Sequence, residues 1–579
     1  MNQITPPQAL AERFEWPHAE VRLSQAASVA ESDGLVCIAR GRPEFPADST
    51  RDALHTPADH WLALFRAHGA QAPERVHGRF GVAFIDTRER SVFLAADRFG
   101  TAPWCFAVRH DRLIVGDRAD LVADTDSALS PDAVYAYLFH HMIPSPLTIF
   151  ADVTRLEGGH RLEWQGDTPR VDAWWRPVFT EPRQMDFGEA KARFMDIIEA
   201  AVRKATDRGH VGAFLSGGTD SSTVAGMLTK VLGRPAETYS MGFDASGYDE
   251  MEYARIASKH FGTNHHEYYV TPQDLLEAIP RVARHYDQPF GNSSAAPAWL
   301  CASLARRDGI DTLLAGDGGD ELFGGNTRYA KQRVFGVYDR VPAALRNALL
   351  EPALSLPISK RLPIVKKAAS YVDQAKVPLP HRIHQYNLLV RLGADQVFAP
   401  DFLAQIDQNA PARAHEAVWQ RINADSDLNR LLAFDWKYTL EDNDLPKILG
   451  TTELAGLGVE FPLLDDALLD FSLSLPLDYK LRGFKLRWFF KEALRDFLPD
   501  AIITKKKHGF GLPFGVWACE HKGLHDLSHD TLNALKGRGI VNPRFIDRLL
   551  GELLPEHPGY YGELVWILTM MELWLSQTR

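Results

Sequence analysis

The alternation of apolar and polar residues changes along the chain near residue 180. Before it, short apolar runs are separated by turn pairs such as Asp86-Thr87 and Arg109-His110, a pattern that favours antiparallel strands and hairpins. From about residue 185 onward, helical segments alternate with short apolar strands, which predicts a parallel sheet followed by helices. We therefore expect an α/β chain of two domains, residues 1–180 and residues 185–579.

The clearest pattern in the second domain is a strand, a turn and a helix within residues 211–227. Apolar residues from Val211 to Leu215 end at the sequence SGGTDSS, and helical spacing begins at Val224. Glycines let the backbone approach an anion closely, and the first-turn N–H groups of the helix point at it. The predicted phosphate-binding residues are Leu215, Ser216, Gly217, Gly218, Thr219, Asp220 and Ser221.

The charge of this loop indicates which phosphate it binds. The lysine of the common Gly-Lys-Ser/Thr loop is missing, and the loop carries an acid, Asp220, instead. A carboxylate repels a bare phosphate unless Mg²⁺ lies between them, so pyrophosphate with its metal is the favoured ligand. The alternative interpretation is a serine-rich turn before a helix.

A second loop later in the chain has the same pattern, an apolar strand that ends in glycines and acids. The apolar strand at residues 311–315 ends in Gly316-Asp317-Gly318-Gly319-Asp320. In open α/β folds ligands bind at the carboxyl edge of the sheet, where both strands end. Taken alone, such an Asp/Gly loop is a solvated turn or a weak calcium site.

Composition narrows the classes of function. The chain has 579 residues, 45% hydrophobic and 24% charged, which is typical of a globular protein. A net charge of −11 argues against a general nucleic-acid binder. The four cysteines form no CxxC pair, which disfavours zinc fingers and redox dithiols. Neither a signal peptide nor an 18-residue apolar stretch is present, so no membrane span and a cytoplasmic location are expected.

The two loops together resemble the ATP pyrophosphatase family and, more narrowly, the asparagine synthetases. SGGTDSS matches the SGGxDS signature, and GDGGDELFGG matches GEGGDExFxGY. The resemblance implies a parallel-sheet, adenine-nucleotide α-hydrolase-like domain that cleaves ATP between its α and β phosphates, with ATP and Mg²⁺ as cofactors. The further residues implied at the nucleotide are Met241, Gly242, Gly316 and Gly318, and those implied at the metal are Asp220 and Asp320.

The first domain resembles the glutamine-hydrolysing domain of asparagine synthetases, which implies an Ntn-type antiparallel β-sandwich with helices. Residues 97–104 resemble its DRxGxxPLYY segment. That domain uses a cysteine at position 2 as nucleophile, where this chain has Asn2. Cys37 lies inside an apolar strand, where core packing is favoured, and residues 39–42 replace the glutamine-holding NGE segment. We infer a degenerate glutaminase-like domain that has kept its fold and lost its chemistry.

Three residues are candidate catalytic groups by the same resemblance. Asp317 replaces the family's glutamate and is expected to orient the incoming amine or the acyl adenylate. Lys447 fits the family's LxK position. Lys507 fits the lysine that reaches the α-phosphate, and we expect it to stabilise charge as pyrophosphate leaves; a solvated lysine run is the alternative.

The family's aspartate pocket is altered. Its Asp-Arg pair aligns with Leu449-Gly450, its Ser-Met pair with Thr452-Glu453, and its Glu-Val-Arg with residues 458–460. Glu460 stands in place of the family's arginine, so a positive side chain that could bind the carboxylate of a substrate is missing. This argues against free aspartate as substrate. The helical residues 326–430 are assigned to packing, with a role in shaping the cavity as the alternative.

The implied reaction adenylates a carboxylate and then transfers it to an amine. A substrate that carries its own amine explains both the missing cysteine and the altered pocket. The chain resembles lasso-peptide macrolactam cyclases, which are asparagine-synthetase-like, lack the nucleophilic cysteine and join a peptide's α-amine to an Asp or Glu side chain. The expected partners are a small-molecule or peptide substrate with an Asp or Glu carboxylate, and a precursor peptide with its protease. The alternatives are an ammonia-using asparagine synthetase homologue and, less favoured, a tRNA-modifying pyrophosphatase or an inactive scaffold.

Overall fold

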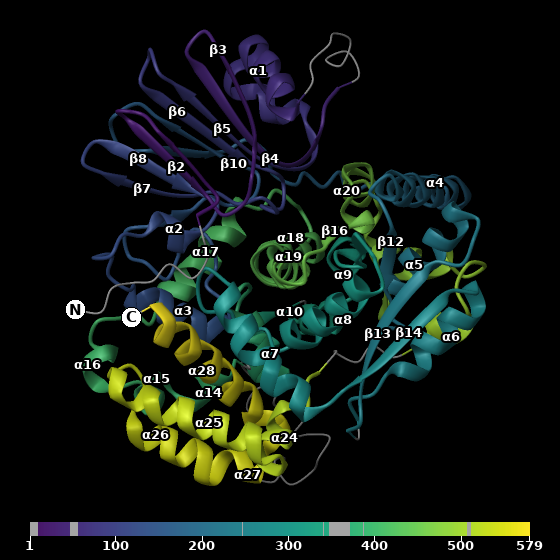
Figure 1. Cartoon of the computed structure of the whole chain (residues 1–579). Helices are drawn as coiled ribbons and strands as arrows, with labels where there is room; N and C mark the ends of the chain where they lie inside the picture. The colour runs from purple at the N-terminus through teal and green to yellow at the C-terminus, as the bar shows by residue number, and fades with distance from the viewer. Residues whose placement is uncertain are drawn as a thin grey trace.

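A computed structural model describes residues 10–46, 56–245, 247–339, 341–346, 371–385, 387–505 and 511–578. It has the α/β architecture expected from the sequence (Figure 1). A β-sandwich formed by the N-terminal part stands above a parallel sheet and a large helical part (Figure 1). Lys507 lies outside the described residues.

Two sheets form the sandwich. The first contains, in spatial order, β1 (Glu12–Glu15), β2 (Ala19–Leu23), β8 (Arg112–Gly116), β7 (Cys105–Arg109) and β9 (Thr154–Arg155). The second contains β11 (Arg170–Ala173), β10 (His160–Trp164), β6 (Ser91–Ala96), β5 (His77–Asp86), β4 (Leu35–Glu44) and β3 (Ser28–Ser32). The pairing is antiparallel, as predicted, except that β2 runs parallel to β8.

Strand β4 shows why the second sheet is covered on both faces. Val36 and Ile38 point into the core shared with the first sheet, whereas Cys37 and Ala39 point to the opposite core under helix α1 (Pro57–His68). Successive strand residues face opposite sides, so an uninterrupted apolar run requires a partner on each side. The prediction that Cys37 belongs to the core is confirmed, since its side chain is fully buried.

The second sheet system is parallel throughout its described strands. Its order is β14 (Asn264–Val270), β13 (Glu237–Phe243), β12 (Val211–Phe214), β15 (Thr312–Leu314) and β16 (Gly458–Glu460). One hydrophobic core lies between this sheet and the helices α4 (Phe187–Thr206), α5 (Thr219–Leu232) and α6 (Met251–Phe261). A second, smaller core lies between the sheet and helix α8 (Ala295–Arg307). Strands β12 and β15 are neighbours, so the two predicted loops leave the same edge side by side.

The helical part is built around the C-terminal helix α28 (Pro558–Thr578). It packs against α7 (Pro272–His285), α24 (Phe514–Glu520) and α25 (Lys522–Leu535). Helix α3 (Pro131–His140) of the N-terminal part joins this core, where the Tyr137 hydroxyl donates to the carbonyl of Ile567 at 2.8 Å. None of the described helices is long and apolar enough to cross a membrane.

One predicted helix is shorter than expected. The pattern LRWFFKEALRDFL predicts a helix over residues 486–498, but α22 spans only Trp488–Ala493. Arg487 has a φ of 54°, in the left-handed region, so the helix cannot include it. This backbone position determines where the Arg487 side chain lies.

Candidate active site

The phosphate loop has the strand–turn–helix form predicted for it. Gly217 has a φ of 69°, and a Cβ there would lie 2.4 Å from the backbone nitrogen of Ala254, so only glycine fits. Gly218 precedes the first residue of α5 and provides no side-chain cap. The first-turn N–H groups of α5 are therefore available to an anion. Ser216 and Ser221 are joined through their hydroxyls at 2.9 Å, which fixes the shape of the turn.

The second loop packs directly on the first. A Cβ on Gly316 would lie 2.7 Å from the backbone nitrogen of Ser221, and one on Gly319 would collide with Asp220. Gly318 has a φ of 99° and begins the short helix α9 (Gly319–Phe323). The glycines of the two loops thus bring Asp220 and Asp320 to one place.

Both acids bind the same arginine, which the sequence did not predict. Arg487 Nη1 donates to Asp220 Oδ2 and to Asp320 Oδ1, at 2.7 Å each, and Nη2 also donates to Asp220. The Arg487 side chain is only 6% exposed and lies over the Phe490 ring. Although burial opposes its charge, the two carboxylates raise the pKa of Arg487. We call Asp220, Asp320 and Arg487 the arginine centre.

Further cations surround the phosphate loop. Lys505 lies 3.1 Å from Glu250, 3.4 Å from the Gly217 carbonyl and over the Tyr253 ring. Burial and the nearby Arg487 lower the pKa of Lys491. Lys505 was not singled out from the sequence, where the lysine run directed attention to Lys507.

A second cation lies between carboxylates at the same sheet edge. Lys447 Nζ is 2.9 Å from Asp444 Oδ1 and 3.7 Å from Asp317 Oδ1. Burial raises the pKa of Asp317 to about 6, against the opposing effect of Lys447. Asp444 and Asp317 raise the pKa of Lys447, although burial opposes its charge. We call Asp317, Asp444 and Lys447 the lysine centre; the structure unites two predicted residues there with Asp444, which was missed.

Asp444 reaches this position because the backbone is locally irregular. Residues Trp436–Asp444 form a π-helix, which runs into α19 (Leu445–Leu454), the helix of Lys447. Such segments are rare and frequently occur at functional sites. Helical periodicity read from the sequence at 3.6 residues per turn therefore misplaces Asp444.

The predicted adenine-side residues lie at the carboxyl end of β13. A Cβ on Gly242 would lie 2.9 Å from the Tyr269 ring and 3.0 Å from Asp249, so this turn is closely packed. Met241 is half-buried one residue earlier. The neighbouring His266 lies in β14 and contacts Glu237 at 2.7 Å. Among the described residues, no group of three or more His, Cys, Asp and Glu side chains is placed to hold a metal.

The altered aspartate-pocket positions line a cavity of about 470 Å³ between the two domains. Leu449, Gly450, Thr452 and Glu453 of α19 form one wall. A Cβ on Gly450 would lie 2.7 Å from the Tyr286 ring, so that ring occupies the space of a side chain. The opposite wall includes Arg40, Arg42 and Arg79 of the sandwich.

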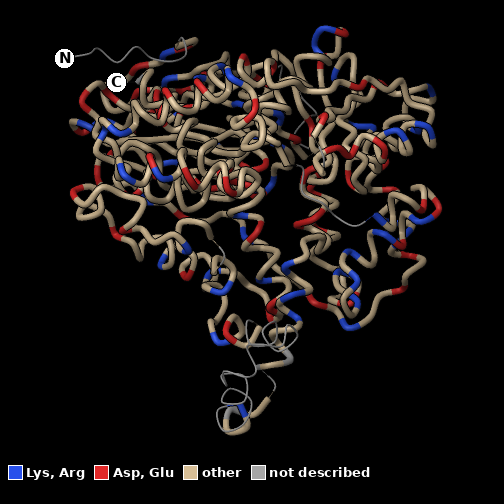
Figure 2. The backbone as a smooth tube through the Cα atoms, turned by 90° about the horizontal axis from the view of Figure 1, so that it is seen from below, with Lys and Arg blue, Asp and Glu red and all other residues tan. Residues whose placement is uncertain are grey.

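Charges of both signs are interspersed over the visible backbone rather than separated by region (Figure 2). The local arrangement of cations around the two loops, and not an overall basic surface, therefore distinguishes the candidate site. Two phosphate-facing glycine loops with acids and buried cations suit a nucleotide with its divalent metal.

Comparisons with known proteins agree with this geometry. The asparagine synthase model matches residues 193–576, more than half of the chain, and the glutamine amidotransferase domain model matches residues 47–175. The chain is 24% identical over 485 residues to "Asparagine synthetase [glutamine-hydrolyzing] 1" of Bacillus subtilis, covering 82% of this chain and 72% of that protein. It is 25% identical over 552 residues to a "Putative asparagine synthetase [glutamine-hydrolyzing]" of Mycobacterium bovis, covering 92% and 80%. The chain thus belongs to the asparagine synthase family, whose members are ATP-dependent carbon–nitrogen ligases that form AMP and pyrophosphate.

Proposed function

We propose that this enzyme adenylates a carboxylate and transfers it to an amine that the substrate itself carries, closing a peptide macrolactam. The observation that carries the proposal is the make-up of the cavity of about 470 Å³ between the domains. Arg40, Gly41 and Arg42, which stand in place of the glutamine-holding segment, line this cavity together with α19. Pockets that hold small-molecule ligands usually measure about 300–1,000 Å³. We infer that this space receives a substrate of the second domain and not glutamine as a source of ammonia.

The arginine centre serves the adenylation step. The phosphates of ATP lie against the N-terminus of α5, where the loop amides and the hydroxyls of Ser216 and Ser221 donate. Asp220 and Asp320 reach one guanidinium nitrogen, so their oxygens are close enough to bind one cation, and they are the donors that Mg²⁺ prefers. When bound, Mg²⁺ neutralises the leaving pyrophosphate. Arg487, Lys491 and Lys505 add positive charge on this side.

The lysine centre serves amide formation. A primary ammonium must lose two protons to become the nitrogen of a secondary amide. Asp317 and Asp444 are two carboxylates that can take protons, and Lys447 between them holds a positive charge near the acyl group. A pKa of about 6 makes Asp317 ionised at neutral pH and still basic enough to accept a proton.

The interdomain cavity supports a substrate larger than aspartate. Its volume of about 470 Å³ lies within the range of drug-sized ligands. Its wall includes Gly450, which stands in place of an arginine of the family. We infer that the cavity receives part of a peptide whose N-terminal amine reaches the lysine centre.

The test is pyrophosphate release from ATP and Mg²⁺ with three sets of substrates: aspartate with ammonia, aspartate with glutamine, and a peptide with a free N-terminus and an internal Asp or Glu. We expect release with the peptide and a product lighter by one water. Release that depends on glutamine would contradict the proposed loss of glutaminase chemistry.

A second candidate is an asparagine synthetase homologue that uses ammonia. The names of the similar proteins favour asparagine synthesis, although both name glutamine and not free ammonia as the nitrogen source. Release with aspartate and ammonia alone, without any effect of the peptide, would select this function.

A further inference from the structure

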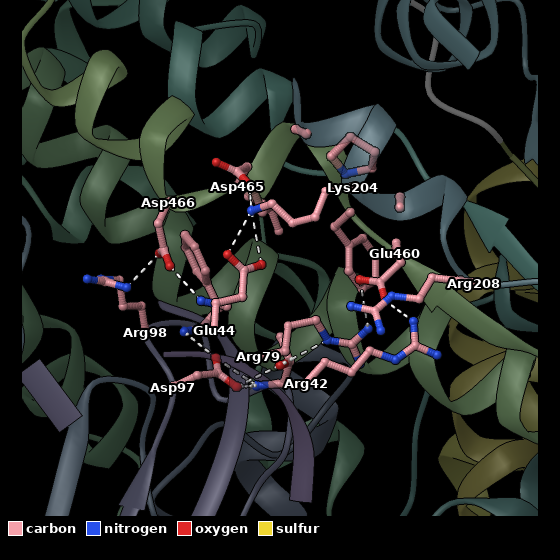
Figure 3. Close-up of a pocket in the computed structure, with 18 residues that line it drawn as sticks. Arg42, Glu44, Arg79, Asp97, Arg98, Lys204, Arg208, Glu460, Asp465 and Asp466 are labelled. Atoms are coloured by element: carbon pink, nitrogen blue, oxygen red, sulfur yellow. Dashed lines mark hydrogen bonds and ion pairs between the residues drawn. The ribbon is translucent and has the colours of Figure 1, made fainter. Parts of the chain in front are cut away.

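The residue that breaks the family pattern most strongly, Glu460, lies at the boundary between the domains. It ends β16, the edge strand of the parallel sheet, and its side chain crosses to the sandwich (Figure 3). Arg42 Nη1 donates to Glu460 Oε1, and Arg79 Nη1 lies 3.9 Å from Glu460 Oε2. Arg79 also donates to the carbonyl of Val459 at 2.5 Å. We call Arg42, Arg79 and Glu460 the interdomain clamp.

The two arginines face this acid from neighbouring strands. Arg42 of β4 and Arg79 of β5 are register partners in the antiparallel ladder, so they stand directly opposite each other. Like charges in that position are destabilising. Glu460 supplies the compensating charge from the other domain, and its side chain is only 16% exposed, which limits screening by water. The sandwich therefore stabilises one particular position of β16.

The same residue holds the loop of the lysine centre. The backbone carbonyl of Glu460 accepts a hydrogen bond from Ala315 at 2.9 Å, just before Gly316 and Asp317. In the ladder, Val459 pairs with Leu313 and Glu460 with Leu314. Glu460 is thus bound through its carboxylate to the first domain and through its backbone carbonyl to the start of the loop that carries Asp317.

We propose that the interdomain clamp positions the loop of Asp317 for amide formation, so that the first domain serves the reaction as a positioning element. The proposal rests on the proposed function only for its kinetic consequence. Arg42, Arg79 and Glu460 act through the backbone of β16 and are positioning residues. The coupling itself can be measured without any substrate.

The first measurement is hydrogen exchange of the backbone amides within residues 311–325. In Glu460→Gln the loop loses its charged anchor, and we expect exchange to become about tenfold faster than in the unmodified chain, the effect of losing roughly one charged hydrogen bond. Arg42→Gln, which removes one partner only, should act in the same direction and covers the case in which Glu460→Gln does not fold. Unchanged exchange in both variants would overturn the proposal.

The second measurement is a charge swap. Arg42→Glu and Glu460→Arg should each slow amide formation about tenfold or more while leaving the KM for ATP unchanged, and the double variant should recover most of the rate. Absence of recovery would mean that the residues act separately and would overturn the proposed coupling.

A matched control is available on the same boundary. Lys204 of α4 contacts Glu44 of the sandwich at 2.8 Å, and neither residue touches β16 in the described ion pairs (Figure 3). Glu44→Gln should change neither loop exchange nor the rate. If no peptide is cyclised by the unmodified enzyme, the proposed function fails, and the exchange experiment still decides whether the clamp holds the loop.

Discussion

The arginine centre and the lysine centre share one arrangement and differ in the cation. In each, a buried cation lies between two carboxylates, one of them from the loop after β15. A guanidinium is rigid, always charged and able to bind two carboxylates at once, whereas an ammonium is a compact point charge. Asp317 and Asp444 raise the pKa of Lys447, so both cations stay charged, and the two centres differ in how the cation meets the carboxylates. Under the proposed function, the planar guanidinium lies at the carboxylates assigned to Mg²⁺, and the ammonium lies at the carboxylates assigned to proton acceptance.

Removal of an acid from the arginine centre should have the largest effect. In Asp220→Asn, we expect pyrophosphate release to fall by about 10³-fold or more, because both the metal and Arg487 lose a charged ligand. Release is measured in steady state with saturating ATP and Mg²⁺. Asp196→Asn, an exposed acid on α4, is the matched control and should retain full activity. Substantial release by Asp220→Asn would contradict the metal assignment.

Removal of the cation from the lysine centre should separate the two steps. In Lys447→Gln, Asp317 and Asp444 lose their shared counter-ion, and amide formation should fall by about 10²-fold. ATP–pyrophosphate exchange, which reports adenylation alone, should remain within about twofold, since the arginine centre is intact. An equal loss in both assays would show that the two centres do not divide the reaction. Lys259→Gln on α6 provides the control.

Arg487→Gln should change the Mg²⁺ concentration that the enzyme needs, with little effect on folding. Arg487 bonds to the carboxylates assigned to Mg²⁺, so the metal must displace it from them. We expect the Mg²⁺ concentration at half-maximal rate to fall about fivefold, equivalent to about 1 kcal/mol of lost competition, while the maximal rate also falls. A rise in that concentration would mean that Arg487 assists metal binding.

The smallest effect concerns pH. The rate of amide formation should rise with pH through about 6, since the pKa of Asp317 is raised to that value and the base acts when ionised. Asp444 contributes to raising this pKa, so Asp444→Asn should move the midpoint to lower pH. ATP–pyrophosphate exchange, measured over the same pH range, should not share this midpoint. A midpoint common to both reactions would place the titrating group outside the lysine centre.

Local sequence patterns predicted the elements of the site better than its side-chain pairs. Strand β12, Val211–Phe214, lies within the apolar run predicted from Val211 to Leu215, and the positive φ of Gly217 confirms the glycine turn after it. Arg487 was missed because it is 267 residues from Asp220 and because its left-handed backbone interrupts the helix that the pattern predicted. Asp444 was missed because a π-helix has no distinct apolar period. Pairing between remote residues depends on packing, which periodicity does not describe.

Glu460 also shows that a residue singled out from the sequence cannot be assigned its partners without the structure. The sequence analysis treated it as a departure from the family, and only as the loss of a positive group that would bind a substrate carboxylate. The structure shows that the partners of Glu460 are Arg42 and Arg79. Both belong to the other domain and lie more than 380 residues earlier in the chain. A change of charge at one position can be interpreted only together with the surface that faces it.

The opposed arginines of β4 and β5 have a consequence for how the chain tolerates substitution. Replacing Glu460 alone would leave two like charges opposed in the ladder, and replacing Arg42 alone would remove a partner of Glu460 across the domain boundary. The residue at each of these three positions therefore limits what the other two can be, and we expect Arg42, Arg79 and Glu460 to tolerate joint replacement better than single replacement.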